Sequence, residues 1–559
     1  MMEPVSLLAK TAIEPRSAKS MGPRQLPRIV FATVLMSLLC SLAVAADRPN
    51  IVLIVSDNQS EKLLGAYGND DIKTPNIDTL AEEGMLFTHA FAASGVCSPT
   101  RATMMTGLMP SQHGVHNAMP SQFDIENWNA IEEFRNLPQT LDDAGYAMAM
   151  IGKYHLGAAQ EPQLGFDDWV TFPTGHTTSF HGVEIIDNGD NYVLEDEHLT
   201  DFWTRKAVEF LHAQSAEQPF LLYLSYNGPY NLPPLVLEPP KNRHAAYYHQ
   251  NVPQFPQEPV HPSLRRLAIE YSDVRALLAE RGEWWYESSE EPDEATALAE
   301  NSWPWQTIGA LNNPTAMIHL ASEMTMLDDG VGRVLEALEE RGLDRNTIVV
   351  FTSDQSSAYG QHGLWGNSSY AQPHPAYMEN MRIPLIVRFP GTVADGETSN
   401  QVINQVDMLP TLLELVGLGE ITIDDSPGRS FVPTLRNEEQ TSLDEAFFEY
   451  ITVRAVATRE WKYVKRLFGD PPELYDLNAD PGEYRNLAAD PEFADVLADL
   501  DTRLTEFFSK YSEEKYDVWQ GGTAKALLMY NDKNEQFEKT FPNFKPPAIE
   551  KATPFSARH

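Results

Sequence analysis

A single cysteine stands at the predicted start of a helix, in the segment Cys97-Ser98-Pro99-Thr100-Arg101. Proline suits the first helical turn because its missing N–H has no partner there, so we expect Ser98 to cap this helix with Cys97 just before it. The positive partial charge of a helix N-terminus favours a thiolate and bound anions, and Arg101 adds a cation. The pattern predicts a reactive cysteine beside an anionic substrate. The alternative is a buried thiol that packs as a small apolar residue.

Two aspartates follow predicted strands, and each precedes an amide, in the pairs Asp57-Asn58 and Asp354-Gln355. Open α/β sheets bind ligands at the carboxyl ends of parallel strands, so we expect these side chains at one edge of a sheet. Two carboxylates and two amide oxygens form an all-oxygen set that suits calcium, or magnesium. Alternatively, each aspartate only caps a helix or shapes a turn.

Lys153 and His155 lie two residues apart, directly after another predicted strand. In an extended backbone, side chains at this spacing point to the same side, so the pair is expected to face one site. The alternative is that both side chains are solvated surface residues.

These residues belong to a series of motifs that resembles the formylglycine-dependent (type I) sulfatases of the alkaline-phosphatase-like superfamily. The family signature, Cys-x-Pro-Ser/Thr-Arg followed by five residues and a glycine, is met in full from Cys97 to Gly107. Further matches in the family's order are Asp57 and residues 152–157, 352–354, 362–365 and 473–477. The resemblance covers about residues 48 to 510.

The resemblance implies an enzyme whose Cys97 is oxidised during export by a formylglycine-generating maturation enzyme. One oxygen of the hydrated aldehyde then attacks a sulfate ester and expels the alcohol, and the other expels sulfate. It also implies roles for other residues of this chain. Arg101, Lys153 and His155 contact the formylglycine and the sulfate, while the metal is held by Asp57, Asn58, Asp354, Gln355 and the converted Cys97.

Several positions depart from the family pattern. The family usually has Asp where this chain has Asn58, and Asn where it has Gln355, so a ligand oxygen is kept but one carboxylate is lost. Tyr230 stands where a histidine is usual, and Asn367, five residues after His362, where a lysine is usual. Because those two positions normally bind sulfate and protonate the leaving oxygen, the leaving-group acid stays open.

His374 lies close in sequence to the replaced lysine and is the first candidate for the leaving-group acid. Tyr230 and His362 are weaker candidates. We expect Tyr230, His362 and Asn367 to bind the substrate.

The elements that position these residues can be read from apolar runs. Continuous β-branched or apolar runs predict buried strands at 49–55, 147–151, 220–224, 347–351 and 384–389. Helical periodicity predicts helices near 76–83, 137–144, 200–213 and 315–341. The alternation indicates an α/β fold with a large, mostly parallel central sheet between helices. Short runs at 446–450, 453–458 and 463–466, with a helix at 491–509, predict a smaller C-terminal antiparallel sheet.

The predicted domains are a catalytic α/β domain at 47–437, a C-terminal α+β subdomain at 438–511 and a tail at 512–559. Residues 231–306 form a proline-rich, irregular insertion in the catalytic domain. Its aromatic residues stack against sugar rings or pack beneath the loop. They are Trp284, Trp285, Tyr286, Trp303 and Trp305.

Residues 1–46 have scattered basic residues, an apolar run at 29–39 and Ala43-Val44-Ala45, which is typical of a cleaved signal peptide. The apolar run is shorter than the ~20 residues that span a bilayer, so we expect a periplasmic or secreted protein without a stable membrane anchor. Cleavage removes Cys40 and leaves Cys97 as the only thiol, which excludes an internal disulfide.

The net charge of −39, from 41 Lys and Arg against 80 Asp and Glu, argues against nucleic acid as a partner. The main hypothesis is therefore a calcium-dependent sulfuric ester hydrolase that acts on a sulfated carbohydrate. One alternative is a phosphonate or phosphate monoester hydrolase of the same fold. The other is a sulfated-glycan binding protein without turnover, suggested by the departures at Asn58, Tyr230, Gln355 and Asn367.

Overall fold

The computed structural model describes residues 48–119, 128–173, 177, 179–230, 232–268, 303–371, 373–438, 444–467 and 470–525, which belong to one compact unit. The predicted signal peptide, the aromatic residues at 284–286 and residues 526–559 lie outside this part of the chain.

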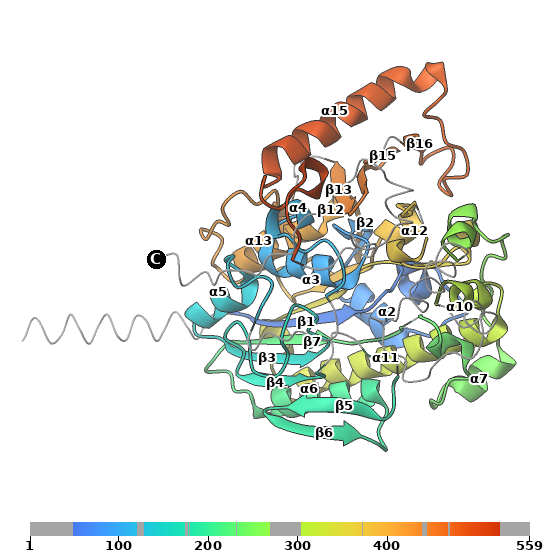
Figure 1. The fold of residues 1–559 in the computed structure, drawn as a ribbon. Coiled ribbons are helices and arrows are strands. Elements are labelled where there is room, and N and C mark those ends of the chain that lie inside the picture. Colours follow the sequence, from blue (N-terminus) through green and yellow to red (C-terminus); the bar gives the residue numbers. More distant parts are fainter. Residues whose placement is uncertain are drawn as a thin grey trace, which may run out of the picture. The chain divides into compact units, whose positions relative to one another are not determined.

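A ten-stranded mixed sheet forms the centre of this unit (Figure 1). Its parallel core consists of β8, β1, β7, β3 and β4, while β11 runs antiparallel to β8 and β2, and β5 runs antiparallel to β4 and β6. The large, mostly parallel sheet is thus confirmed, with an antiparallel strand at the predicted run 384–389. In spatial order the strands are β12 (Glu397–Asn404), β2 (Met85–Phe91), β11 (Leu385–Arg388), β8 (Thr347–Ser353), β1 (Asn50–Ser56), β7 (Phe220–Ser225), β3 (Ala147–Gly152), β4 (Asp168–Thr171), β5 (Val183–Asp187) and β6 (Asp190–Leu194).

Helices cover both faces of the sheet, which explains why β1 is apolar from Ile51 to Val55. Val52 and Ile54 pack into a hydrophobic cluster with α2 (Pro75–Glu82), α6 (Leu199–Ala213) and α11 (Pro314–Glu340). Ile51, Leu53 and Val55 pack on the other face, against α3 (Cys97–Thr106), α5 (Leu137–Asp143) and α13 (Met408–Leu415). Figure 1 shows the same division, with α11 and α6 below the sheet and α3 and α13 above it.

A second, four-stranded antiparallel sheet follows in the C-terminal part of the chain, as predicted. It comprises β13 (Glu445–Tyr450), β14 (Val453–Thr458), β15 (Trp461–Arg466) and β16 (Glu473–Asp476), and it packs against α15 (Ala494–Tyr511). The Phe447 and Phe507 rings stack with centroids 3.6 Å apart at this interface. Strand β13 joins the large domain through Glu449 N, which donates to Ala93 O at 2.9 Å. The smaller sheet is therefore anchored only a few residues before Cys97.

Within the predicted insertion, the described residues form short helices. These are η3 (Leu235–Leu237), α7 (Ala245–Gln250) and α10 (Trp303–Ala310), and both η3 and α7 pack against α11.

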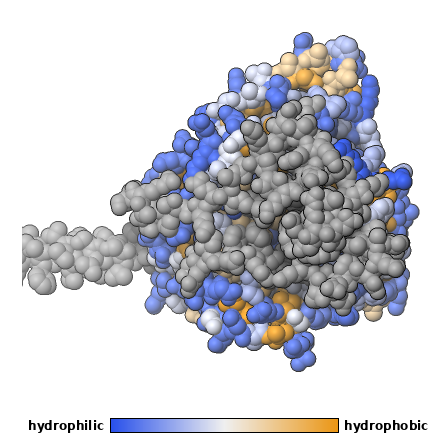
Figure 2. All heavy atoms as spheres, in the orientation of Figure 1, coloured by the Kyte–Doolittle hydropathy of each residue, from blue (hydrophilic) through white to orange (hydrophobic). Residues whose placement is uncertain are grey.

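The described surface in Figure 2 is largely hydrophilic, as the high charge predicts. Exposed apolar side chains include Tyr192 and Val193 in β6. Among the described residues, no helix has both the length and the apolar character needed to cross a membrane.

Candidate active site

Helix α3 begins at Cys97, and its N-cap is Val96, which has no side chain able to cap. The predicted cap at Ser98 is wrong, because Ser98 lies in the first turn. Its hydroxyl instead accepts a hydrogen bond from Met119 N at 2.9 Å, so the side chain holds a neighbouring loop against the helix.

The side chain of Cys97 meets the two strand-end aspartates. Asp57 follows β1 and Asp354 follows β8, and the parallel register of these strands places them side by side. The Cys97 sulfur lies 3.4 Å from Asp57 Oδ1, and Lys153 Nζ lies 3.1 Å from that sulfur and 2.6 Å from Asp57 Oδ2. Ligand atoms of Asp57, Cys97 and Asp354 lie within 4.8 Å of one another. The structure therefore brings the sequence-predicted nucleophile, carboxylates and lysine into one buried group, which we call the Cys97 site.

Arg101 connects this group to the neighbouring strands. Its Nε and Nη2 lie 2.9 and 2.7 Å from Asp354 Oδ2, and its Nη1 donates to Lys153 O at 2.8 Å. Nη1 also donates to Ser225 Oγ at 2.5 Å, at the end of β7. One guanidinium thus connects the ends of three strands of the central sheet, β3, β7 and β8, to α3.

The amides that depart from the family pattern lie in contact with one another. Gln355 Nε2 is 2.5 Å from Asn58 Oδ1 and 3.1 Å from the Cys97 sulfur. Asn367 Nδ2 donates to the same Asn58 oxygen at 2.9 Å. Two uncharged residues therefore meet where the family usually has an aspartate and a lysine, so the replacements compensate in charge.

The Cys97 site is fully buried, and this sets its protonation. Burial and the neighbouring Asp57 raise the pKa of Asp354 to about 6. Burial would lower the pKa of Lys153, but Asp57 and Cys97 hold it above its ordinary value. Burial, with Asp57 beside it, raises the pKa of the Cys97 thiol to about 12. Burial and the Asp57 carboxylate therefore oppose a thiolate at Cys97, and the predicted reactive thiolate stays a prediction.

Lys153 and His155 share a loop but not an orientation. Gly152 has φ +110°, where an added Cβ would lie 1.9 Å from Ser225 O, and His155 has φ +58°. The expected extended backbone is therefore wrong here. Lys153 points to Asp57, while His155 Nε2 donates to Met119 O at 3.0 Å.

The remaining predicted substrate residues lie in different surroundings. His374 is buried, its Nδ1 donates to Ser368 O at 3.1 Å and its ring lies 4.7 Å from that of Tyr450. Burial lowers the pKa of His374 to about 4, so the ring is neutral at pH 7. Tyr230 is buried in the hydrophobic cluster that contains α6 and α11. Their roles in binding or proton transfer stay predictions.

His362 belongs to a second polar group, which we call the His362 cluster. Its ring stacks on Tyr377 with centroids 3.8 Å apart. Ligand atoms of His362, Glu379 and Glu483 lie within 4.8 Å of one another. Glu379 is paired with Lys62 at 2.6 Å, and Glu483 is paired with Lys462.

Sequence reasoning missed several polar residues that support the Cys97 site. Ser225 accepts from Arg101, Thr100 Oγ1 lies 3.4 Å from Gln355 Oε1, and Gln405 Nε2 donates to Asp354 O at 2.9 Å. Ser225 ends a predicted strand, as Asp57 and Asp354 do, and this placement was a usable signal. Gln405 had none.

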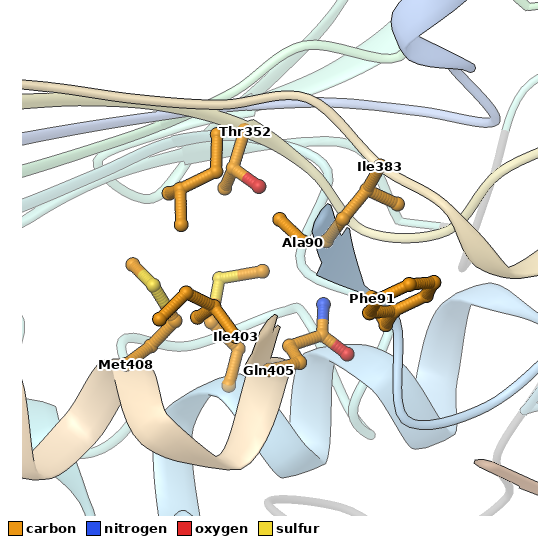
Figure 3. A pocket seen from close by; sticks show the side chains of 9 residues that line it. Ala90, Phe91, Thr352, Ile383, Ile403, Gln405 and Met408 are labelled. Carbon is orange, nitrogen blue, oxygen red and sulfur yellow. The ribbon is translucent and has the colours of Figure 1, made fainter. Parts of the chain in front are cut away.

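A small cavity lies between the sheet and helices α3 and α13 (Figure 3). Its lining is mostly apolar and includes Phe91, Ile383, Ile403 and Met408, with the Gln405 amide at its edge. None of the predicted site residues lines it. It is a gap in the packing and not a substrate pocket.

Comparisons with known proteins agree with this geometry. The sulfatase family model matches residues 49–418, and a model of the N-sulphoglucosamine sulphohydrolase C-terminal region matches residues 366–510. N-acetylglucosamine-6-O-sulfatase of Bacteroides thetaiotaomicron is 28% identical, covering 84% of this chain and 88% of the relative. Human N-sulphoglucosamine sulphohydrolase is 26% identical, covering 86% of this chain and 94% of the relative.

A solved structure of a protein with its substrate D-glucosamine-2-N,6-O-disulfate superposes with a TM-score of 0.65 at 26% identity. The match covers 83% of this chain and 98% of that chain. The family model spans well over half of the sequence, and the strand ends that carry the family's motifs belong to one sheet. This chain therefore belongs to the sulfatase family and is a sulfatase-type hydrolase.

Proposed function

We propose that this protein is an exported sulfuric ester hydrolase that removes sulfate from a sulfated carbohydrate, using a formylglycine made from Cys97 and a bound calcium. The observation that carries the proposal is the convergence of Cys97, Asp57, Asp354, Lys153 and Arg101 in one buried site.

An unmodified Cys97 thiol is poorly suited to be the nucleophile of this site. A thiol with a pKa of about 12 is protonated at neutral pH and is a poor nucleophile. When present, formylglycine supplies a hydrated aldehyde whose oxygen attacks sulfur and whose second hydroxyl allows sulfate to leave. The proposal requires a formylglycine-generating maturation enzyme as a partner and export through the predicted signal peptide, to the periplasm or the medium.

The residues of the Cys97 site fit a hard divalent cation. Asp57 and Asp354 are fully buried, and burial, with Asp57 beside it, raises the pKa of Asp354. Rotating the Gln355 amide by half a turn would direct its oxygen toward Asn58 Oδ1 and Asp57 Oδ1, which its nitrogen now contacts. Calcium would be held by Asp57, Asn58, Asp354, Gln355 and the converted Cys97, and it would supply charge stabilisation for the transferring sulfuryl group. Magnesium suits the same oxygens.

The cationic side chains have distinct proposed tasks. Lys153 Nζ contacts both Asp57 and the Cys97 sulfur. Lys153 is therefore proposed to orient the reactive group of residue 97 and to donate a hydrogen bond to it. Arg101 holds Asp354 in place and adds positive charge near the sulfate. His155 is oriented through its bond to Met119 O for contact with the substrate.

The leaving-group acid is assigned to His374 as the first candidate, with Tyr230 and Asn367 as substrate-binding residues. His362, which was expected to bind the substrate, stacks on Tyr377 in the His362 cluster, and we assign it a structural role. Because the free-enzyme pKa of His374 is about 4, this role requires either acidic pH or a rise in pKa when the sulfate anion binds. A His374→Ala variant should then lose more activity on a sugar sulfate than on 4-nitrophenyl sulfate, whose leaving group needs no proton.

A carbohydrate substrate is supported by the relatives. An N-acetylglucosamine-6-O-sulfatase and an N-sulphoglucosamine sulphohydrolase each align over more than four-fifths of this chain. The substrate in the superposed structure is a sulfated glucosamine. We therefore propose a sulfated amino sugar or a glycan that contains one as the substrate class.

The test combines peptide mass spectrometry across Cys97 with assays of the secreted protein from a host that has the maturation enzyme. We expect formylglycine at residue 97 and sulfate release from sulfated amino sugars. Unmodified cysteine in fully active protein would contradict the mechanism. Faster hydrolysis of a phosphonate ester would favour the phosphonate hydrolase alternative, and glycan binding without any release would favour the binding protein.

A further inference from the structure

The end of the described chain is tied into the interior by a buried lysine. Lys525 is only 1% exposed. Its Nζ donates to Glu133 Oε1 at 2.6 Å and to Ala130 O at 2.9 Å, and its backbone N donates to Gly114 O at 2.8 Å. One residue therefore joins two segments, 113–119 and 128–133, that are separate in the sequence.

Tyr516 strengthens the same junction. Its hydroxyl donates to Glu133 Oε1 at 2.5 Å, and its carbonyl accepts from His116 Nε2 at 2.7 Å. An added Cβ on Gly114 would lie 2.5 Å from the Tyr516 ring, so the segments that contain these two residues are in direct contact. Asp517 is paired with the buried Arg454 at 2.7 Å, which anchors this stretch to the smaller sheet.

The first joined segment, 113–119, borders the Cys97 site. His113 Nε2 lies 3.1 Å from Thr103 Oγ1 in α3. Met119 N donates to Ser98 Oγ, beside Cys97, and Met119 O accepts from His155 Nε2 at 3.0 Å. This segment thus sets which His155 nitrogen carries the proton.

The second joined segment, 128–133, pairs with the loop that contains His155. Ala130 N donates to Leu156 O and Ala158 N donates to Trp128 O, both at 2.8 Å. Residues 154–158, which follow Lys153 directly, are therefore paired along this segment.

We propose that Lys525 is a positioning residue of the active site: through Glu133, Ala130 and Gly114 it holds the two segments that fix the orientation of His155. This proposal rests on the proposed role of His155. The buried ammonium and carboxylate need each other, because removal of either leaves an unpaired charge away from water. The pair therefore couples the C-terminal segment 512–525 to the loop at 153–158.

The experiment compares Lys525→Met, which keeps side-chain length but removes the charge, with Lys510→Met on the exposed face of α15. For 4-nitrophenyl sulfate we expect kcat of Lys525→Met to fall at least about tenfold, with KM within about threefold. Hydrogen exchange of residues 113–119 and 153–158 should become at least about tenfold faster, while the β1 and β8 amides keep their protection. Lys510→Met should match the parent, and Lys525→Arg should recover most of the lost kcat.

Parent-like kcat and exchange in folded Lys525→Met would overturn the proposal, as would a uniform loss of protection over the whole chain. If Lys525→Met does not fold, hydrogen exchange of Glu133→Gln tests the proposal in its place, because this variant keeps the acceptor oxygen and loses only the charge. The same local increase in exchange supports the proposal, and unchanged exchange refutes it. The exchange measurement does not need turnover, so a parent without sulfatase activity would refute the proposed function and leave the test of Lys525 intact.

Discussion

The Cys97 site and the His362 cluster contain similar types of side chain. Each combines two buried carboxylates with a third ligand residue and two cationic side chains. They differ in how the charges are used. In the Cys97 site, Lys153 is shared between Asp57 and the sulfur, and the pKa of Asp354 stays raised. In the His362 cluster, Lys62 overcomes burial and lowers the pKa of Glu379.

Burial also raises the pKa of Glu483 in the His362 cluster, so the pKa of a carboxyl group does not by itself separate the two groups. Their other contacts do. The His362 cluster joins Glu483, in the C-terminal part of the chain, to Met378 N of α12 (Met378–Met381) and to the His362 and Tyr377 rings. Its pairs connect structural elements. The Cys97 site adds amide oxygens and a helix N-terminus to its carboxylates, which are features that bind metals and anions.

The largest expected effect is the loss of the reactive residue. Cys97→Ala should lower kcat for sulfate release by at least about 10³-fold, because no nucleophile remains. Glu379→Gln in the His362 cluster should keep kcat within about threefold. Steady-state kinetics on 4-nitrophenyl sulfate check both, and equal losses would erase the distinction between the two regions.

Calcium should stabilise the protein through the Cys97 site alone. At about 100 times its Kd, calcium adds about 2.7 kcal/mol to the free energy of unfolding, which thermal denaturation detects as a rise in Tm. Asp354→Asn should lose most of this rise. Glu483→Gln, although less stable throughout, should keep it.

The pH dependence of this stabilisation follows from Asp354. Because its folded pKa of about 6 exceeds its ordinary value, the metal-free protein should lose stability as pH rises from about 4 through 6. Calcium competes with the same proton, so its effect on Tm should be full above about pH 7 and fade as pH falls through 6. A calcium effect independent of pH would contradict this assignment.

Charge at Asn58 should tune metal affinity. Asn58→Asp restores a third carboxylate, and we expect the Kd for calcium to fall about tenfold in titration calorimetry. The exposed Asn437→Asp serves as the matched control and should leave the Kd unchanged. An unaltered Kd in Asn58→Asp would mean that residue 58 does not bind the metal.

The smallest expected effect on catalysis is at His362. Its ring stack with Tyr377 is worth about 1 kcal/mol, so His362→Ala should lower Tm. The value of kcat/KM should stay within about threefold of the parent. A loss of more than tenfold would instead show that His362 binds the substrate, and the two regions would then share one function.

Much of the fold was predictable because buried parallel strands are continuous apolar runs. The runs at 49–55, 147–151, 220–224 and 347–351 became β1, β3, β7 and β8. Strand β12 was not predicted, because Glu397, Ser399 and Gln401 interrupt the pattern at the sheet edge. Short strands such as β4 to β6 carry too few residues for a clear period.

The candidate site was predictable where residue type and strand end coincide, as at Asp57 and Asp354. Lys525 shows the opposite case, since it falls in the segment predicted as a tail, and no local pattern marks a lysine that pairs with Glu133 from 392 residues away. The left-handed backbone at His155 was equally invisible, because a tertiary bond to Met119 O holds it.

By itself, the sequence determined the sheet's buried strands, the helix that starts near Cys97 and the residue types available for an anionic substrate and a cation. These depend on local periodicity and on chemistry carried by single residues. The tertiary structure alone decided which charges share a buried site and how far burial shifts the pKa values of Cys97 and Asp354. It also decided that His362 stacks on Tyr377 in the His362 cluster. Desolvation and ion pairing depend on distances between residues hundreds of positions apart, and the order of the chain does not specify those distances.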